Sequence, residues 1–390
     1  MKENPAVTVL VLVAAGSKYE TKRETGLSHF LEHMVFKGTT KRPKASDISR
    51  ELDSIGAHYN AFTSQEFTGY YAKVDKKHIA LALDVVSDLY VDPLLDASEL
   101  EKEKGVIIEE IRMYQDMPHR HVQDLFMELM YGDQPAGWNI AGTEASVKSF
   151  TREDFVRYRG KQYVAEATTV AIAGAFDEAT IVEEVEKAFA QISTGKKACK
   201  LAVIEKQTEP RVMTSFRETD QTHLVLGVRS FPVSSPHDPA LHVLATVLGK
   251  GMSSRLFTKL RDEMGVCYYV KADHDAYTDH GIFSISAGVD NKRVEEVLRV
   301  LLAEMAKLRD ELVPDAELQK AKDFMLGGMV LGLETSDSLA EFFGMQDVVK
   351  GKIENLDDIS TKIRAVTAEQ VRDVAKAIFK NEGLNLAIIG

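Results

Sequence analysis

Two stretches of this sequence repeat one pattern: Thr151-Arg-Glu-Asp-Phe155 followed by Val170-Ala-Ile-Ala-Gly174, and Thr367-Ala-Glu-Gln-Val371 followed by Leu386-Ala-Ile-Ile-Gly390. In each copy a threonine is answered three residues later by Asp or Gln, which is the capping-box pattern that begins a helix. Each copy then ends in a short apolar strand. The offset is 216 residues both between the threonines (367 − 151) and between the glycines (390 − 174). A constant offset predicts an internal duplication, and therefore two domains of similar fold.

The junction between the copies is predicted near the middle of the chain. The segment Ser193-Thr-Gly-Lys-Lys-Ala198 is polar, contains glycine and follows an amphipathic helical pattern that ends near Ile192. We therefore expect a linker at 194–206, between an N-terminal domain at 1–193 and a C-terminal domain at 207–390.

Helical and strand patterns are spread unevenly along the chain. Apolar spacing predicts helices at 26–37, 46–55, 78–90, 98–115 and 121–131, and strands at 7–15, 68–74, 222–228 and 281–287. The helices come in clusters rather than after each strand, which favours an α+β fold over a doubly wound parallel sheet. We expect two homologous α/β sandwich domains, with helices packed on sheets rich in antiparallel pairs.

The strongest chemical signal is His29-Phe-Leu-Glu-His33, inside the helix predicted at 26–37. Residues four apart project from one face of a helix, so both imidazoles could bind one Zn²⁺ ion. Glu32 lies on the same side and could take a proton from water without binding the metal. A helix on which two histidines and a glutamate merely share a face is the weaker interpretation.

A catalytic zinc ion needs a third protein ligand. The helix predicted at 98–115, with Ser98 as its N-cap, carries Glu103 and Glu110 two turns apart on one face. Carboxylates on an apolar flank usually have a partner, and a metal ion is a suitable one. Other acidic residues of this helix, among them Glu109, make a solvated acidic face the alternative, which the residues alone favour.

The zinc motif and its neighbours resemble a known family. The stretch Gly26-Leu-Ser-His-Phe-Leu-Glu-His-Met-Val-Phe-Lys-Gly-Thr39 is similar to the pitrilysin/insulinase zinc peptidases, which carry the inverted zinc motif of the inverzincins. Over nearly its whole length the chain resembles the small bacterial processing-protease-like members and the mitochondrial processing peptidase β subunit. The family's ligand precedes an apolar residue and follows another important glutamate by seven positions. The resemblance therefore implies Glu110 as the ligand and Glu103 as a supporting or catalytic group.

The resemblance also implies substrate-binding residues. The segment that begins at Asn60 resembles the edge strand beside the family's active site, where a peptide would add as a further strand through Asn60, Ala61, Phe62 and Thr63. Arg261 and Tyr268 fall where the family binds the substrate backbone and stabilises the transition state. The residues alone would make Arg261 a surface charge and Tyr268 a core aromatic.

The second half of the chain is expected to bind no metal. At the offset of 213 residues between Gly38 and Gly251, His29 falls on His242, but the other two positions of the zinc motif fall on Ala and Thr. One histidine cannot hold zinc alone. His274 has no partner one helical turn away and is interpreted as a polar strand residue. We therefore expect one Zn²⁺ ion per chain.

Composition narrows the class of protein. With 48 basic and 60 acidic residues, the net charge of −12 argues against nucleic-acid binding. Two cysteines exclude a disulfide framework and suggest free thiols in a reducing compartment. The apolar run at 7–15 is shorter than the roughly 20 residues of a spanning helix and lacks the basic start of a signal peptide. A cytoplasmic protein with no membrane span is expected.

The leading hypothesis is a zinc-dependent endopeptidase that hydrolyses peptides or unfolded polypeptide segments, with Glu32 as general base. The resemblance implies a clamshell chamber completed by a second subunit, and so a homodimer, or a heterodimer with a related subunit. The alternative is a non-catalytic scaffold or partner subunit of a processing-peptidase-like or respiratory core complex. Such chains have lost the zinc residues, which are intact here.

Overall fold

The computed structural model describes residues 4–390, which form two compact units. Unit 1 comprises the residues up to Met113, Trp138–Leu201 and Gly332–Ile353, and unit 2 comprises Tyr114–Gly137, Ala202–Leu331 and Glu354–Gly390. The units are therefore not two contiguous halves of the chain.

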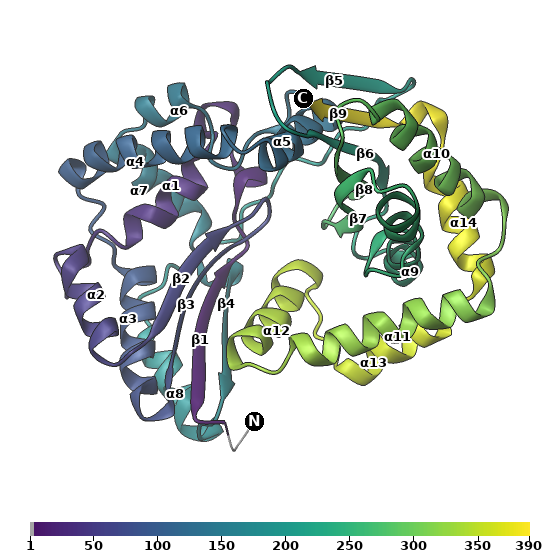
Figure 1. Cartoon of the computed structure of the whole chain (residues 1–390). Helices are drawn as coiled ribbons and strands as arrows, with labels where there is room; N and C mark the ends of the chain where they lie inside the picture. The colour runs from purple at the N-terminus through teal and green to yellow at the C-terminus, as the bar shows by residue number, and fades with distance from the viewer. Residues whose placement is uncertain (1–3) are drawn as a thin grey trace. The chain divides into compact units, whose positions relative to one another are not determined.

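Among the described residues, unit 1 contains a four-stranded antiparallel sheet in the order β2-β3-β1-β4 (Figure 1). Its strands are β1 (Ala6–Val13), β2 (His58–Thr63), β3 (Thr68–Asp75) and β4 (Thr168–Gly174). Its helices are α1 (Leu27–Val35), α2 (Ala45–Ser54), α3 (Ile79–Val91), α4 (Ala97–Gln115, which runs two residues past the unit boundary), α6 (Glu144–Ser149), α7 (Arg152–Gln162), α8 (Glu178–Ala188) and α12 (Ser336–Lys350).

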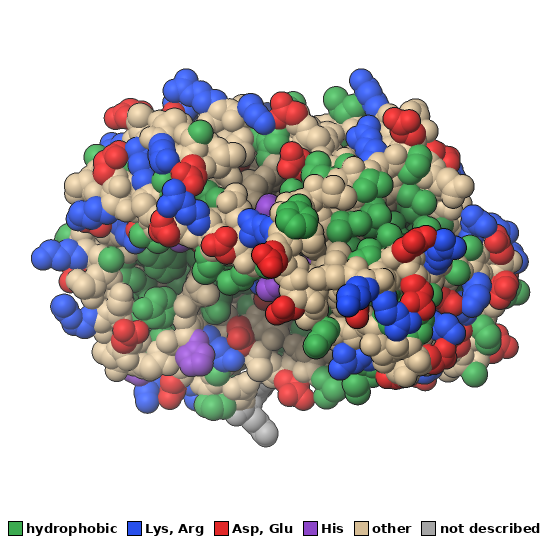
Figure 2. All heavy atoms as spheres, turned by 45° about the horizontal axis from the view of Figure 1, so that its top comes forward, with side chains coloured by type: hydrophobic (Ala, Val, Ile, Leu, Met, Phe, Trp, Pro, Cys, Tyr) green, Lys and Arg blue, Asp and Glu red, His purple; other side chains and the backbone are tan. Residues whose placement is uncertain are grey.

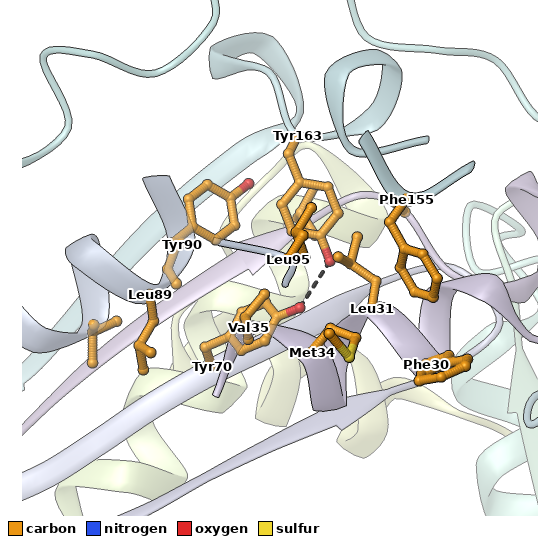
Figure 3. Packing of buried hydrophobic residues seen from close by; sticks show 14 of the residues in the cluster. Phe30, Leu31, Met34, Val35, Tyr70, Leu89, Tyr90, Leu95, Phe155 and Tyr163 are labelled. Carbon is orange, nitrogen blue, oxygen red and sulfur yellow. Dashed lines mark hydrogen bonds between the residues drawn. The ribbon is translucent and has the colours of Figure 1, made fainter. Parts of the chain in front are cut away.

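The core of unit 1 lies against one face of this sheet and fixes helix α1. Figure 3 shows Phe30 and Met34 of α1 in a cluster with Tyr70 of β3 and Tyr163, whose hydroxyl groups are hydrogen-bonded at 2.8 Å. Because the apolar side of α1 is buried here, the side that carries the zinc motif faces away from the core. The position of the motif is thus set by packing.

The opposite face of the sheet is covered by α12, which comes from the second half of the sequence. Leu10 and Leu12 of β1 point to this face and pack with Ala340 of α12, as the strand alternation requires. The close contact depends on Gly344, because a Cβ atom there would lie 2.7 Å from Leu12 Cδ1.

Unit 2 contains, in the described chain, a five-stranded sheet in the order β5-β9-β6-β8-β7, in which only the β5–β9 pair is parallel. Its strands are β5 (Arg211–Ser215), β6 (Thr222–Ser230), β7 (Cys267–Ala276), β8 (Gly281–Val289) and β9 (Asn385–Ile389). Its helices are α5 (Pro118–Tyr131), α9 (Asp238–Gly249), a π-helix (Phe257–Glu263), α10 (Val294–Asp310), α11 (Asp315–Gly332), α13 (Leu356–Ala365) and α14 (Ala368–Ile378).

Helix α5 is the counterpart of α12, since it comes from the first half of the sequence and packs in unit 2. Phe126 and Met130 of α5 lie against Val225 of β6 and Ile389 of β9. Here too a glycine makes room, because a Cβ atom on Gly227 would lie 2.6 Å from the ring of Phe126. The two units thus exchange one helix each. The boundaries predicted at 1–193 and 207–390 do not include this exchange. Local patterns locate a helix but do not reveal which sheet it covers.

The α+β class and the antiparallel-rich sheets are as predicted, and the repeated elements occupy matching places. β4 pairs with β1 as β9 pairs with β6, and both capping boxes form, at Thr151 and at Thr367. One local prediction was wrong. The N-cap of α4 is Asp96, whose carboxylate accepts hydrogen bonds from the backbone N–H groups of Ser98 and Glu99 at 2.8 and 3.1 Å.

The packing of α12 leads to a first prediction. Gly344→Leu should lower the free energy of unfolding by about 1–3 kcal/mol, because the added side chain overpacks the contact with β1. Gly328→Leu is the matched control, since this glycine lies in helix α11 with nothing within 4 Å of its Cβ position. Denaturant unfolding of both variants measures the difference. Equal stability would contradict the packing of α12 on this sheet.

Candidate metal centre

Helix α1 begins at a tightly built turn. Gly26 has a φ of 94°, and its Cβ position lies 2.6 Å from the carbonyl oxygen of Ala141, so only glycine fits. Glu20 is buried and accepts hydrogen bonds from the backbone N–H groups of Gly26 and Ser28 at 2.9 and 2.7 Å. Burial raises the pKa of Glu20 to about 8, even though these hydrogen bonds favour the carboxylate. Sequence reasoning did not find Glu20, because it precedes the helix and shares no periodic pattern with it.

The three predicted ligands come together in unit 1. Their ligand atoms all lie within 4.8 Å of one another. One carboxylate oxygen of Glu110 lies 3.7 Å from His29 Nε2, and the other lies 3.4 Å from His33 Nε2. Glu109, the neighbouring candidate, points away, since its side chain is 72% exposed and pairs with Arg112 at 2.8 Å. The geometry therefore favours Glu110 over Glu109 as the third ligand.

Glu103 contacts Nδ1 of His33, the ring nitrogen that does not face Glu110. Its buried carboxylate lies 3.0 Å from His33 Nδ1 and 2.6 Å from Lys37 Nζ. Burial would raise the pKa of Glu103, but the hydrogen bonds from His33 and Lys37 lower it. Burial alone would likewise lower the pKa of His33, but the hydrogen bond to Glu103 and the charges of Glu110 and Glu32 raise it. Lys37 was missed as a site residue, although it follows His33 by four residues, just past the end of α1.

A carboxylate behind a histidine orients a ligand without touching the metal. Glu103→Gln is therefore expected to weaken zinc binding by about 10–100-fold. Glu101→Gln is the matched control, because Glu101 is exposed on the same helix and pairs with Lys104 at 2.7 Å. Zinc titration against a competing chelator measures both variants. Unchanged affinity in a folded Glu103→Gln chain would remove Glu103 from the site.

Glu32 lies beside the edge strand of the sheet. Thr63 Oγ1 donates a hydrogen bond to Glu32 Oε2 at 2.5 Å. Among the described residues β2 is an edge strand, paired only with β3. Two pockets share Asn60, one of about 280 Å³ beside α2 and the end of α1, and one of about 200 Å³ beside β1 and α12. An unpaired strand edge flanked by pockets has the form of a site for an extended peptide.

The structure brings Arg261 and Tyr268 together in unit 2. Arg261 lies on the π-helix and donates a hydrogen bond to the carbonyl of Cys267 at 2.7 Å, and its guanidinium carbon lies 5.8 Å from the centre of the Tyr268 ring. Tyr268 follows Cys267 at a register shift of β7 and is 71% exposed, so the interpretation as a core aromatic was wrong. Both side chains are accessible to a ligand.

Comparison with known proteins identifies the family. A model described as insulinase (peptidase family M16) matches residues 1–144, and one described as the peptidase M16 inactive domain matches residues 149–325. The uncharacterized zinc protease YmxG of Bacillus subtilis is 36% identical over 392 residues, which cover 100% of this chain and 95% of that protein. The chain belongs to the insulinase family. The resemblance predicted from the zinc motif is thereby confirmed, and insulinase-family relatives of this chain are named zinc proteases.

Solved structures confirm the two-domain insulinase fold. A protease from Helicobacter pylori matches with a TM-score of 0.93 at 23% identity, over 100% of this chain and 94% of that chain. A chain of complex III2 from Candida albicans matches with a TM-score of 0.87 at 18% identity, over 100% and 92%. The fold therefore occurs in a protease and in a chain of complex III2. The side chains of the site, rather than the fold, must distinguish the two functions.

Two further observations concern partners. Among the described residues, no helix has both the length and the apolar character needed to cross a membrane. On the face shown in Figure 2, basic and acidic side chains are interspersed rather than gathered by sign.

Proposed function

We propose that this insulinase-family chain is a zinc-dependent endopeptidase that hydrolyses peptides or unfolded polypeptide segments in a clamshell chamber. The observation that carries the proposal is the grouping of His29, His33 and Glu110, with Glu32 next to them on α1. A scaffold protein has no use for such a group, because clustered carboxylates and imidazoles cost free energy unless a cation or a proton is shared among them.

The donor set fits zinc. Imidazole nitrogen and carboxylate oxygen are both zinc ligands, and a tetrahedron with bonds of about 2.1 Å has edges of about 3.4 Å. The distance of 3.4 Å between Glu110 Oε2 and His33 Nε2 is close to that edge, and the other carboxylate oxygen, Oε1, lies 3.7 Å from His29 Nε2. Zinc bound by these residues would polarise the scissile carbonyl group and lower the pKa of a bound water molecule.

The chain's own residues supply the other steps. Glu32 accepts the proton of the attacking water and returns it to the leaving amine, while Thr63 holds its carboxylate in place. The outer edge of β2, at Asn60, Ala61, Phe62 and Thr63, binds the peptide backbone as an added strand. Arg261 and Tyr268 bind the substrate and stabilise the negative charge that develops on its carbonyl oxygen.

Incubation with a mixture of peptides, with and without a zinc chelator, tests the proposal. We expect the purified chain to cleave unstructured peptides but not a folded protein. The chelator should abolish cleavage, and added zinc should restore it. A chain that binds zinc but cleaves no peptide, or that binds no zinc at these residues, would instead support the non-catalytic scaffold or partner subunit.

We also propose that the active form is a homodimer, in which metal residues of one copy act with Arg261 and Tyr268 of the other. The basis is that the two sets lie in different units of the chain. Mixing two inactive variants, Glu32→Gln and Arg261→Ala, should restore up to about half of wild-type activity per mixed dimer, because one of its two chambers is then intact. If subunits exchange but activity does not return, each chain completes its own site. Activity only with a related subunit would indicate a heterodimer.

A further inference from the structure

Unit 2 contains a second group of potential metal ligands, separate from the site described above. Asp238 and His242 lie one turn apart on α9, and His274 lies on β7, which packs against that helix. The three ligand atoms lie within 4.8 Å of one another. We expected no metal in the second half because only the positions equivalent to the zinc motif were compared. That comparison could not show that β7 brings another histidine to helix α9.

The distances within this group match a metal polyhedron. Asp238 Oδ1 lies 3.5 Å from His242 Nε2 and 3.4 Å from His274 Nε2. Both separations are close to the edge of about 3.4 Å in a tetrahedron of zinc–nitrogen and zinc–oxygen bonds. They exceed the usual length of a hydrogen bond between these atom types.

The buried ring nitrogen Nε2 of His274 lies next to the carboxylate of Asp238. The side chain of His274 is fully buried, and its Nδ1 lies 3.1 Å from both the carbonyl oxygen of Ile282 and Ser230 Oγ. The carbonyl only accepts and the Ser230 hydroxyl can also accept, so Nδ1 carries the proton. In the neutral ring Nε2 then has a lone pair, and this atom lies 3.4 Å from Asp238 Oδ1. Neither atom has a hydrogen-bond partner within residues 4–390. Two facing, buried, electron-rich atoms require a cation between them.

We propose that Asp238, His242 and His274 bind a divalent transition-metal ion, with zinc as the favoured ion. Two imidazoles and one carboxylate suit zinc and its neighbours rather than Ca²⁺ or Mg²⁺. The bond from Nδ1 of His274 to a backbone carbonyl is the orienting contact that metal-binding histidines make. The side chain of His242 is 36% exposed, so an ion can reach the site from solvent.

The second site reuses one position of the first. His242 follows His29 by 213 residues, and the same offset relates His274 to Ala61 on β2 and Asp238 to Thr25. Helix α9 contacts β7, the edge strand of its sheet, as α1 contacts β2 in unit 1. The two sites therefore occupy equivalent helix–strand contacts, but only one ligand position, that of His29 and His242, is common to both. An ion in unit 2 would tie α9 to the edge strand.

The experiment uses the full-length chain without an affinity tag, carrying His29→Gln and His33→Gln so that only the second site remains. The metal-free protein is titrated with zinc against a competing chelator, and Co²⁺ is used to record the ligand-field spectrum. We expect one equivalent of zinc and a tetrahedral Co²⁺ spectrum. Adding His242→Ala should weaken binding by at least about tenfold. His237→Ala, at the exposed neighbouring histidine, should leave binding unchanged.

Two results would overturn the proposal. One is the absence of stoichiometric zinc in the folded chain that lacks the first site, in which case a proton between Asp238 and His274 is the cation. The other is binding that neither His242→Ala nor Asp238→Asn weakens. Thermal unfolding with and without zinc gives a second readout, because an ion bound only by the folded chain raises its stability. The proposal does not depend on peptidase activity, and either can fail alone.

Discussion

Glu32→Gln is expected to lower the rate of peptide hydrolysis by about 10²–10⁴-fold while the chain keeps its zinc. Glutamine has the shape of glutamate and can still accept the hydrogen bond from Thr63, but it cannot take a proton from water. The change therefore removes the general base and leaves the ligands His29 and His33 in place.

Measurements of kcat/KM and of zinc content on the same preparation test this expectation. Glu99→Gln is a suitable control, because Glu99 pairs with Lys102 at the exposed start of α4. A folded Glu32→Gln chain without zinc would make Glu32 a ligand. Full activity in this variant would assign the base to another residue.

Glu110→Gln should lose most of the zinc bound with His29 and His33, with a fall in the affinity of that site of about 100-fold or more, and peptide hydrolysis should fall with it. A neutral amide is a poorer zinc ligand than a carboxylate, and here it would replace the only acidic member of the group. Glu109→Gln is the matched control, one residue earlier on the same helix and directed to solvent.

The metal content of the two purified variants shows which glutamate of α4 binds the metal. Retention of zinc by Glu110→Gln together with its loss from Glu109→Gln would show that the helix presents the other glutamate to the metal. Loss from neither would mean that the third ligand lies outside α4.

Sequence reasoning succeeded where one helix or strand carries the whole signal. The zinc motif needs only the helical period, so His29, Glu32 and His33 could be placed from the residues alone. The choice of Glu110 came from the family resemblance, because nothing in the composition of α4 separates one glutamate from its neighbours. Roles for these side chains remain predictions until they are measured.

The failures share a physical cause. Contacts between segments that are far apart in the sequence produce no periodic pattern of residues. Glu20 reaches α1 through backbone N–H groups, which the sequence does not display. His274 reaches Asp238 only because β7 packs on α9. The residues alone indicated a core aromatic at Tyr268, because an aromatic residue in a strand is usually half-buried, whereas here the ladder shifts register next to it.

The exchange of α5 and α12 determines how the two units would behave if the backbone were cut between them. As far as the structure describes the chain, the backbone passes between the units five times, after residues 113, 137, 201, 331 and 353. A protease nick within 194–206 would therefore leave four other connections, and the nicked protein should migrate as one particle until it is denatured. A gene split at this point would give two fragments that each hold a helix belonging to the other's sheet. Neither fragment should be soluble alone, and co-expression should reconstitute the pair.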